Sequence, residues 1–123
     1  MRTKKEILIV DDDPALQSML TKRLHANGYS CRLASSVEEA LETFKKNRPD
    51  LVILDLAFQK TDGTAFLKYA RDLDTEPNTP PVIVLSGVSN REVVDYVKYL
   101  GAKEFMTKPY ESSELLSLVE SHI

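Results

Sequence analysis

Several short stretches of the chain are uninterrupted runs of apolar residues, such as Leu51-Val52-Ile53-Leu54. A run of this kind is typical of a strand that is buried on both faces of a parallel sheet. Two further stretches, shorter and more mixed in composition, also have the character of strands. The predicted strands cover residues 6–10, 30–34, 50–55, 81–85 and 104–107.

Between these strands, apolar residues recur every three or four positions, which is the period of a helix with one buried face. Capping residues mark the helix starts: Asp13 followed by Pro14, the capping box that begins at Ser36, Asn90, and either Ser112 or Ser113. The expected core positions are Leu16, Met19, Leu20 and Leu24 in the first helix, Val37, Ala40, Leu41 and Phe44 in the second, Phe66, Leu67, Ala70 and Leu73 in the third, Val93, Val97 and Leu100 in the fourth, and Leu115, Leu116 and Val119 in the fifth.

Strands and helices thus alternate along the whole chain, without a repeat or a linker, so residues 1–123 are expected to form one domain. Parallel strands joined by right-handed helical crossovers make a three-layer, doubly wound α/β sandwich of the flavodoxin-like type. The simplest order of its five-stranded parallel sheet is 2-1-3-4-5. In that order the first and third strands are neighbours.

Composition and charge exclude several classes of protein. Cys31 is the one cysteine, so no internal disulfide and no Cys/His metal site is expected, and a reducing, cytoplasmic location fits best. The apolar run after the basic start is too short for a signal peptide or a membrane span. The net charge is -3 with both signs interspersed, so no nucleic-acid or membrane surface is expected on this chain.

Polar residues follow the apolar strands where their carboxyl ends should meet, which is where open α/β sheets bind ligands. Asp11 and Asp12 follow the first strand, and Asp55 ends the third. Two unit charges about 4 Å apart repel by about 4 kcal/mol at an effective dielectric constant near 20, so protons or a cation must join them. Oxygen ligands without His or Cys favour Mg²⁺. Ser86 and Lys108 end two further strands.

The ordered set of these residues resembles the receiver domain of response regulators in two-component signal transduction, over essentially the whole chain. The residues that carry the resemblance are Asp11-Asp12 after Ile-Leu-Ile-Val, Asp55 in Asp-Leu-Val-Ile-Leu-Asp-Leu, Gly63, Ser86 after Val-Ile-Val-Leu, Gly101-Ala102, Phe105 and Lys108-Pro109-Tyr110.

This resemblance implies a phospho-acceptor signalling domain rather than an enzyme with its own substrate. Asp55 would take a phosphoryl group from the phosphohistidine of a sensor histidine kinase or a histidine phosphotransfer protein, or from a small phosphodonor. Ser86 and Lys108 would bind the phosphoryl oxygens. The ligands of Mg²⁺ would be Asp12 and Asp55 directly, Asp11 through water, and the backbone carbonyl of Ala57.

The resemblance also implies a switch and an output surface. Ser86 would move toward the phosphoryl group and Phe105 would swing inward, and because Phe105 has no hydroxyl, its inward position should be populated without phosphate. The output surface would consist of the fourth helix, the fifth strand and the fifth helix, and would bind an effector or a second copy. The residues expected on it are Val94, Asp95, Lys98, Tyr99 and Tyr110.

The chain departs from the family pattern in the loop after Asp55. Many receivers have a Met-Pro pair where this sequence has Phe58 and Gln59. Ala57 and Val88, which should flank the phosphate, are small and apolar and offer no group to hold a hydrolytic water. We therefore expect slow to moderate autodephosphorylation.

Three other functions remain open from the residues. A receiver-like docking module without phosphorylation would have the same fold, although nothing is missing from the acceptor site. A flavin-binding electron carrier also shares the strand order, but three aspartates from Asp11 to Asp13 would repel the flavin phosphate. A hydrolase with an aspartyl-phosphate intermediate should have a second acid just after the nucleophile, where this chain has Leu56-Ala57.

Overall fold

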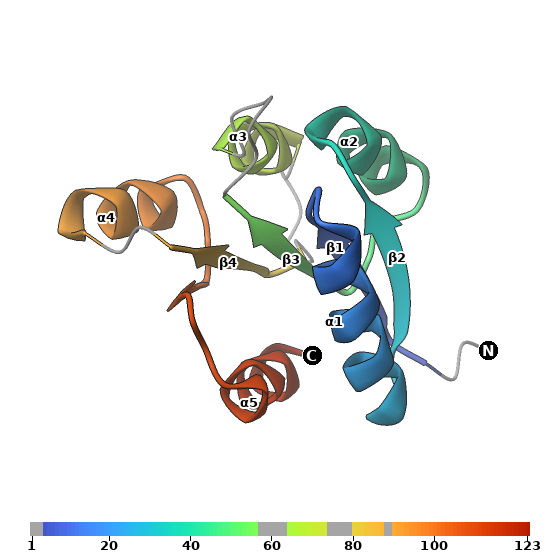
Figure 1. Ribbon diagram of the computed structural model, residues 1–123. Helices are drawn as coiled ribbons and strands as arrows, with labels where there is room; N and C mark the ends of the chain where they lie inside the picture. The colour runs from blue at the N-terminus through green and yellow to red at the C-terminus, as the bar shows by residue number, and fades with distance from the viewer. Residues whose placement is uncertain (1–3, 57–63, 74–79, 88–89) are drawn as a thin grey trace.

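A computed structural model describes residues 4–56, 64–73, 80–87 and 90–123, and in it one parallel sheet runs through the molecule (Figure 1). The strand order is β2-β1-β3-β4-β5, as predicted. The strands are β1 (Glu6–Val10), β2 (Ser30–Ala34), β3 (Leu51–Asp55), β4 (Val82–Ser86) and β5 (Glu104–Thr107).

The helices begin where the sequence places capping residues. Asp13, Ser36 and Asn90 each accept a backbone N–H of the first helical turn, at 2.9, 3.1 and 2.9 Å respectively. The expected cap at Ser112 or Ser113 is wrong, because both residues lie inside the last helix and Glu111, which precedes it, makes no side-chain cap. The helices are α1 (Pro14–Ala26), α2 (Val37–Lys46), α3 (Thr64–Leu73), α4 (Arg91–Tyr99) and α5 (Ser112–His122).

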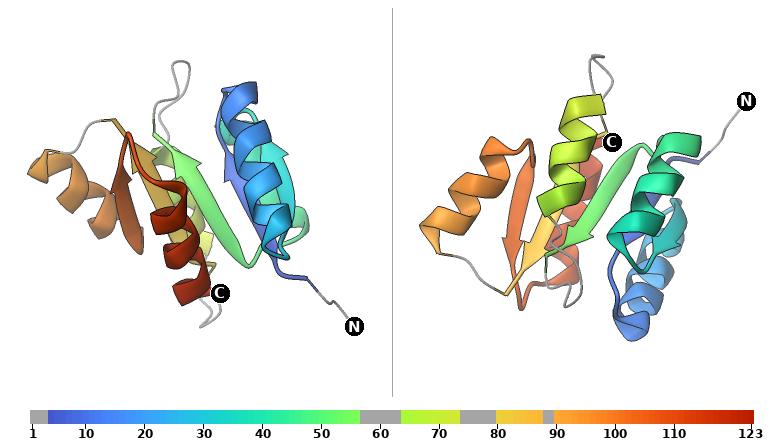
Figure 2. Two further views of the ribbon diagram at one scale, coloured as in Figure 1. Left: turned by 60° about the horizontal axis from the view of Figure 1, so that its bottom comes forward. Right: turned by 90° about the horizontal axis from the view of Figure 1, so that it is seen from above.

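Helices cover both faces of the sheet, which gives the three predicted layers (Figure 2). Alternate strand residues face opposite layers, so the interior has two apolar clusters. The cluster on the α2, α3 and α4 side contains Phe44 and Phe66, whose rings meet edge to face with centroids 5.7 Å apart. The cluster on the α1 and α5 side contains Leu24 and Val119. These two clusters hold the carboxyl ends of the strands in place.

The helix patterns predict the buried faces with a few errors. Met19 was expected in the core but is 41% exposed. It lies next to Leu20, and because each residue turns a helix by about 100°, Leu20 takes the core position and Met19 lies at its border. Val94 was expected to face outward but is half-buried, as is Val93. No helix in the described ranges is long and apolar enough to span a membrane.

Candidate functional site

Asp11 and Asp55 lie side by side at the carboxyl edge of the sheet, because β1 and β3 are neighbours. Val10 is paired with Leu54, so Asp11 and Asp55, the next residue of each segment, are also level with each other. Both carboxylates are buried, with Asp11 1% and Asp55 5% exposed. Asp12, in contrast, is exposed to solvent. The structure thus brings two of the three predicted acids together and leaves the third at the rim.

Lys108 supplies a positive charge to this pair of acids. Its Nζ lies 2.6 Å from Asp55 Oδ2, in a salt bridge whose lysine side chain is 28% exposed. The Lys108 backbone N–H donates to the carbonyl of Ser86 at 2.8 Å, which ties the end of β5 to the end of β4. The bond from Lys108 to Pro109 is cis. Ser86 is itself buried and ends the strand next to Asp55.

The surroundings of Asp11 favour its neutral form. Burial is the largest cause, and the negative charge of the Asp55 carboxylate acts in the same direction. The backbone N–H of Asp13, which donates to Asp11 Oδ1 at 2.9 Å, and the charge of Lys108 oppose them. Together these effects raise the pKa of Asp11 from 3.8 to about 7. Near neutral pH, a proton therefore balances part of the negative charge of the site.

The same two acids fit a hard cation. Asp11 Oδ2 is buried and receives no hydrogen bond from any described residue, which is costly for a carboxylate oxygen. No group of three His, Cys, Asp or Glu side chains within the described ranges is gathered tightly enough to enclose a metal. Mg²⁺ is commonly held by one or two carboxylates plus water, which is the donor set that Asp11 and Asp55 offer. The expected ligand Ala57 lies outside the described residues.

Gln17 belongs to the site, although sequence reasoning missed it. Gln17 is 7% exposed, and its side-chain amide donates to the carbonyl of Asp11 at 2.6 Å. The sequence did contain a signal, since Gln17 is three residues before Leu20 and seven before Leu24, on the apolar face of α1. A polar residue at such a position needs buried hydrogen-bond partners.

The predicted switch residue Phe105 is half-buried and packs against the cluster on the α2, α3 and α4 side. It pairs with Val84 in the middle of β4. Its movement on phosphorylation stays a prediction.

The residues expected on the output surface do not all lie together. Asp95, Lys98 and Tyr99 are exposed on α4, and Tyr99 is 75% exposed. Tyr110 instead packs against the cluster on the α1 and α5 side, on the other face of the sheet from α4. There, burial raises the pKa of Tyr110, and the negative charges of Asp11 and Asp55 act in the same direction.

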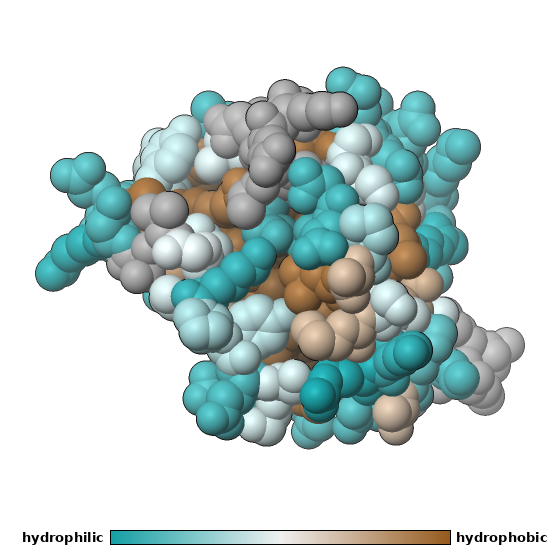
Figure 3. All heavy atoms as spheres, viewed as in Figure 1, coloured by the Kyte–Doolittle hydropathy of each residue, from teal (hydrophilic) through white to brown (hydrophobic). Residues whose placement is uncertain are grey.

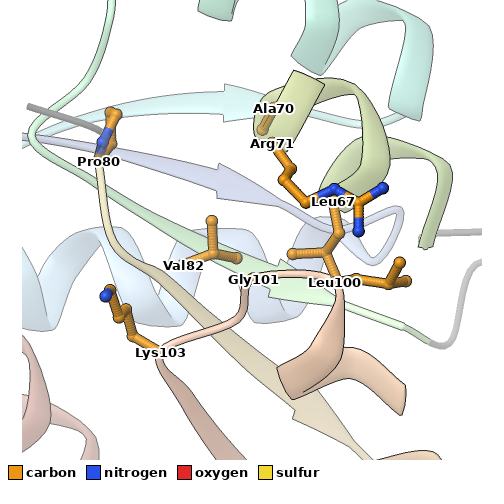
Figure 4. A pocket seen from close by; sticks show the side chains of 8 residues that line it. All are labelled: Leu67, Ala70, Arg71, Pro80, Val82, Leu100, Gly101 and Lys103. Atoms are coloured by element: carbon orange, nitrogen blue, oxygen red, sulfur yellow. The ribbon is translucent and has the colours of Figure 1, made fainter. Parts of the chain in front are cut away.

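One hollow in the surface lies far from Asp11 and Asp55, and another lies close to them. One, of about 150 Å³, is lined by side chains that include Val82, Leu100 and Lys103 (Figure 4). Val82 begins β4, so this hollow lies at the opposite edge of the sheet from Asp55. The other borders Lys108 and lies between α1 and α5, where apolar side chains gather in the face shown in Figure 3. Its lining is Asp13, Leu16, Met19, Lys108, Pro109, Tyr110 and Ser112.

Comparison with known proteins agrees with the fold and with the family that the sequence resembles. A family model described as the response regulator receiver domain matches residues 7–120. The solved structure of the Vibrio cholerae chemotaxis protein CheY4 has a TM-score of 0.89 at 26% identity, covering 98% of this chain and 100% of that one.

Curated relatives are longer than this chain. The response regulator MprA of Mycobacterium sp. (strain KMS) is 38% identical over 113 residues, which are 90% of this chain and 47% of that protein. The probable transcriptional regulator ycf27 of Porphyridium aerugineum is 34% identical over 120 residues, 96% of this chain and 48% of that protein. The chain therefore spans about half the length of these relatives.

Proposed function

Because the chain belongs to the response regulator receiver domain family, whose members are signalling domains of two-component systems, we propose that Asp55 is its phospho-acceptor. The phosphoryl donor is a phosphohistidine of a sensor histidine kinase or of a histidine phosphotransfer protein, or a small phosphodonor. An Asp55 oxygen forms the new bond to phosphorus as the bond from phosphorus to the donor breaks.

The observation that carries this proposal is the placement of Asp55. Its carboxylate is buried at the end of β3, has Lys108 Nζ at 2.6 Å and lies beside Asp11. An ionised carboxylate needs no general base to act as a nucleophile. Phosphoryl transfer requires mainly positioning and compensation of the charge on the phosphoryl oxygens. Lys108 provides one positive charge for this purpose, and Ser86 provides a hydroxyl from the adjacent strand end.

Mg²⁺ supplies further charge compensation when it is bound. The residues that hold it are Asp11, Asp12, Asp55 and the carbonyl of Ala57, in the roles that the family resemblance implies. The exposed position of Asp12 leaves its carboxylate accessible from solvent, and the unsatisfied Oδ2 of Asp11 supports a cation or its bound water between the strand ends.

Phosphorylation then alters a binding surface. Ser86 ends β4, the strand next to Asp55, and Phe105 is on the edge strand β5, so a movement of Ser86 toward the phosphoryl group would open space under Phe105. The surface formed by α4, β5 and α5 binds an effector or a second copy of the chain, and exposed Tyr99 with Asp95 and Lys98 supports this. The signalling response would then depend on which of these partners binds to that surface.

The test is labelling with ³²P-acetyl phosphate, with Mg²⁺ and with a chelator. The wild type should be labelled only with Mg²⁺, and Asp55→Asn should not be labelled at all. Glu42→Gln is the matched control, because it removes an exposed carboxylate on α2, away from the proposed output surface, and should be labelled like the wild type. Label that persists in Asp55→Asn would refute the assignment. A folded wild type that takes no label from acetyl phosphate or from a phosphohistidine protein would instead favour the docking module without phosphorylation.

The same experiment measures the lifetime of the phosphorylated form. Ala57 and Val88, which lie outside the described residues, offer no polar side chain to orient a hydrolytic water. We therefore expect slow to moderate loss of the label after the donor is removed. Loss within seconds would contradict this expectation.

A further inference from the structure

Gln17 connects three backbone segments near the acids. Its Nε2 donates to the carbonyl of Asp11 at 2.6 Å, and lies 3.3 Å from both the carbonyl of Ala34 and the hydroxyl of Ser35. Asp11 follows β1, Ala34 ends β2, and Gln17 itself is on α1. One buried side chain therefore joins the ends of two strands to the helix that follows the acids.

The turn that carries Asp11 and Asp12 is also held by its own backbone. The Asp11 N–H donates to the carbonyl of Ala34 at 3.0 Å, and the Gln17 N–H donates to the carbonyl of Asp13 at 3.0 Å. With the side chain of Gln17 on the Asp11 carbonyl, the peptide groups on both sides of the Asp11 Cα are fixed. This backbone sets the direction of the Asp11 Cα–Cβ bond, and the Asp13 N–H, which donates to Asp11 Oδ1 at 2.9 Å, orients the carboxylate.

A fixed turn is needed because the acids repel each other. Asp11 and Asp55 are both buried, and a flexible turn would relax by moving the Asp11 carboxylate away. A metal site that must be ready for Mg²⁺ has to resist this relaxation. Outer groups that orient the ligands of a metal commonly change its affinity ten- to a hundredfold.

We propose that Gln17 is a positioning residue that holds the Asp11–Asp12 turn in the geometry that binds Mg²⁺. This inference rests on the proposed function of the site, and it adds a residue that does not itself touch the cation or the phosphoryl group. The competing explanation is that Gln17 only satisfies buried carbonyl groups. That explanation predicts lower stability with unchanged Mg²⁺ affinity.

The test compares Gln17→Met, which keeps the length of the side chain but removes its donors, with Leu24→Val, a core change on the same helix away from the turn. Mg²⁺ affinity is measured by isothermal titration calorimetry on proteins shown to be folded by circular dichroism. Gln17→Met should bind Mg²⁺ about ten- to a hundredfold more weakly, whereas Leu24→Val should bind like the wild type. Labelling by acetyl phosphate should need more Mg²⁺ in Gln17→Met but reach a similar rate at saturation.

An Mg²⁺ affinity of Gln17→Met within twofold of the wild type would overturn the inference and leave the proposed function intact. If the wild type itself binds no Mg²⁺, both fail. Should Gln17→Met not fold, hydrogen exchange of side-chain amides in the metal-free wild type is a second measurement that can overturn the inference. The Gln17 amide protons should exchange far more slowly than those of Asn47, which is exposed. Equal exchange rates would mean that the side chain does not hold the turn.

Discussion

Replacing Asp11 with Asn removes one negative charge from the buried pair and leaves most of the local structure in place. The Asn oxygen can still accept the Asp13 N–H, which donates to Asp11 Oδ1 at 2.9 Å. The Asn amide can also donate toward Asp55, where a carboxylate could only repel. Asp11→Asn is therefore expected to stabilise the metal-free protein at alkaline pH.

The size of this effect follows from the pKa of Asp11, which rises from 3.8 to about 7 on folding, chiefly through burial. The folded state thus holds this proton more tightly than the unfolded state, so the wild type loses stability as pH rises between these two values. Each pKa unit corresponds to about 1.4 kcal/mol, so the ionised Asp11 costs about 4 kcal/mol well above pH 7. The neutral Asn avoids this cost.

Urea denaturation of the metal-free proteins at about pH 8.5 and pH 5 checks this reasoning. At the higher pH, Asp11→Asn should be more stable than the wild type by roughly 2–4 kcal/mol, and the gap should shrink by roughly 2–3 kcal/mol at the lower pH. Saturating Mg²⁺ should stabilise the wild type more than the variant, because the cation needs the charge that Asn lacks. Asp95→Asn, which removes an exposed carboxylate on α4, is the control. The difference in stability between this variant and the wild type should not depend on pH in this way. Equal stability of Asp11→Asn and wild type at both pH values would refute the argument.

Lys108→Met removes the cation 2.6 Å from Asp55, and should lower the free energy of unfolding by about 1–3 kcal/mol in urea without Mg²⁺, because the buried carboxylate then lacks its strongest donor. Phe44→Ala should lower it by about 3–5 kcal/mol, since Phe44 is fully buried against Phe66; a loss under about 1 kcal/mol would contradict the packing. Burial raises the pKa of Cys31 to about 11, so its thiol should react with 5,5′-dithiobis(2-nitrobenzoate) at pH 8 far more slowly in the folded protein than in urea.

Strand order and the meeting of Asp11 with Asp55 could be predicted because each depends on simple local patterns. Uninterrupted apolar runs identify buried parallel strands, and capping residues such as Ser36 and Asn90 fix where helices begin. Once the first and third strands are neighbours, the residues at their ends must lie together. No side-chain detail is needed for that step.

Other features depend on packing that no local pattern encodes. Met19 and Leu20 are both apolar, and only the fit of α1 against the sheet decides that Met19 is partly exposed. Tyr110 lies between β5 and α5, where no helical or strand period sets the direction of its side chain. Gln17 was missed because its partners include the backbone carbonyls of Asp11 and Ala34. Every residue has a backbone carbonyl, so the sequence does not indicate which of them needs a side-chain donor.

The charges of the site explain how a resting receiver can fold before metal or phosphate arrives. Lys108 compensates Asp55 directly, and a proton shared near Asp11 compensates the second buried acid around neutral pH. A cation that enters displaces that proton, so Mg²⁺ binding should weaken as the pH falls below about 7. In the proposed function, a phosphoryl group on Asp55 would then take Lys108 as its own partner. Proton, cation and lysine would thus compensate the negative charges of the site in turn, and we expect the fixed Asp11 turn to let this exchange proceed without refolding.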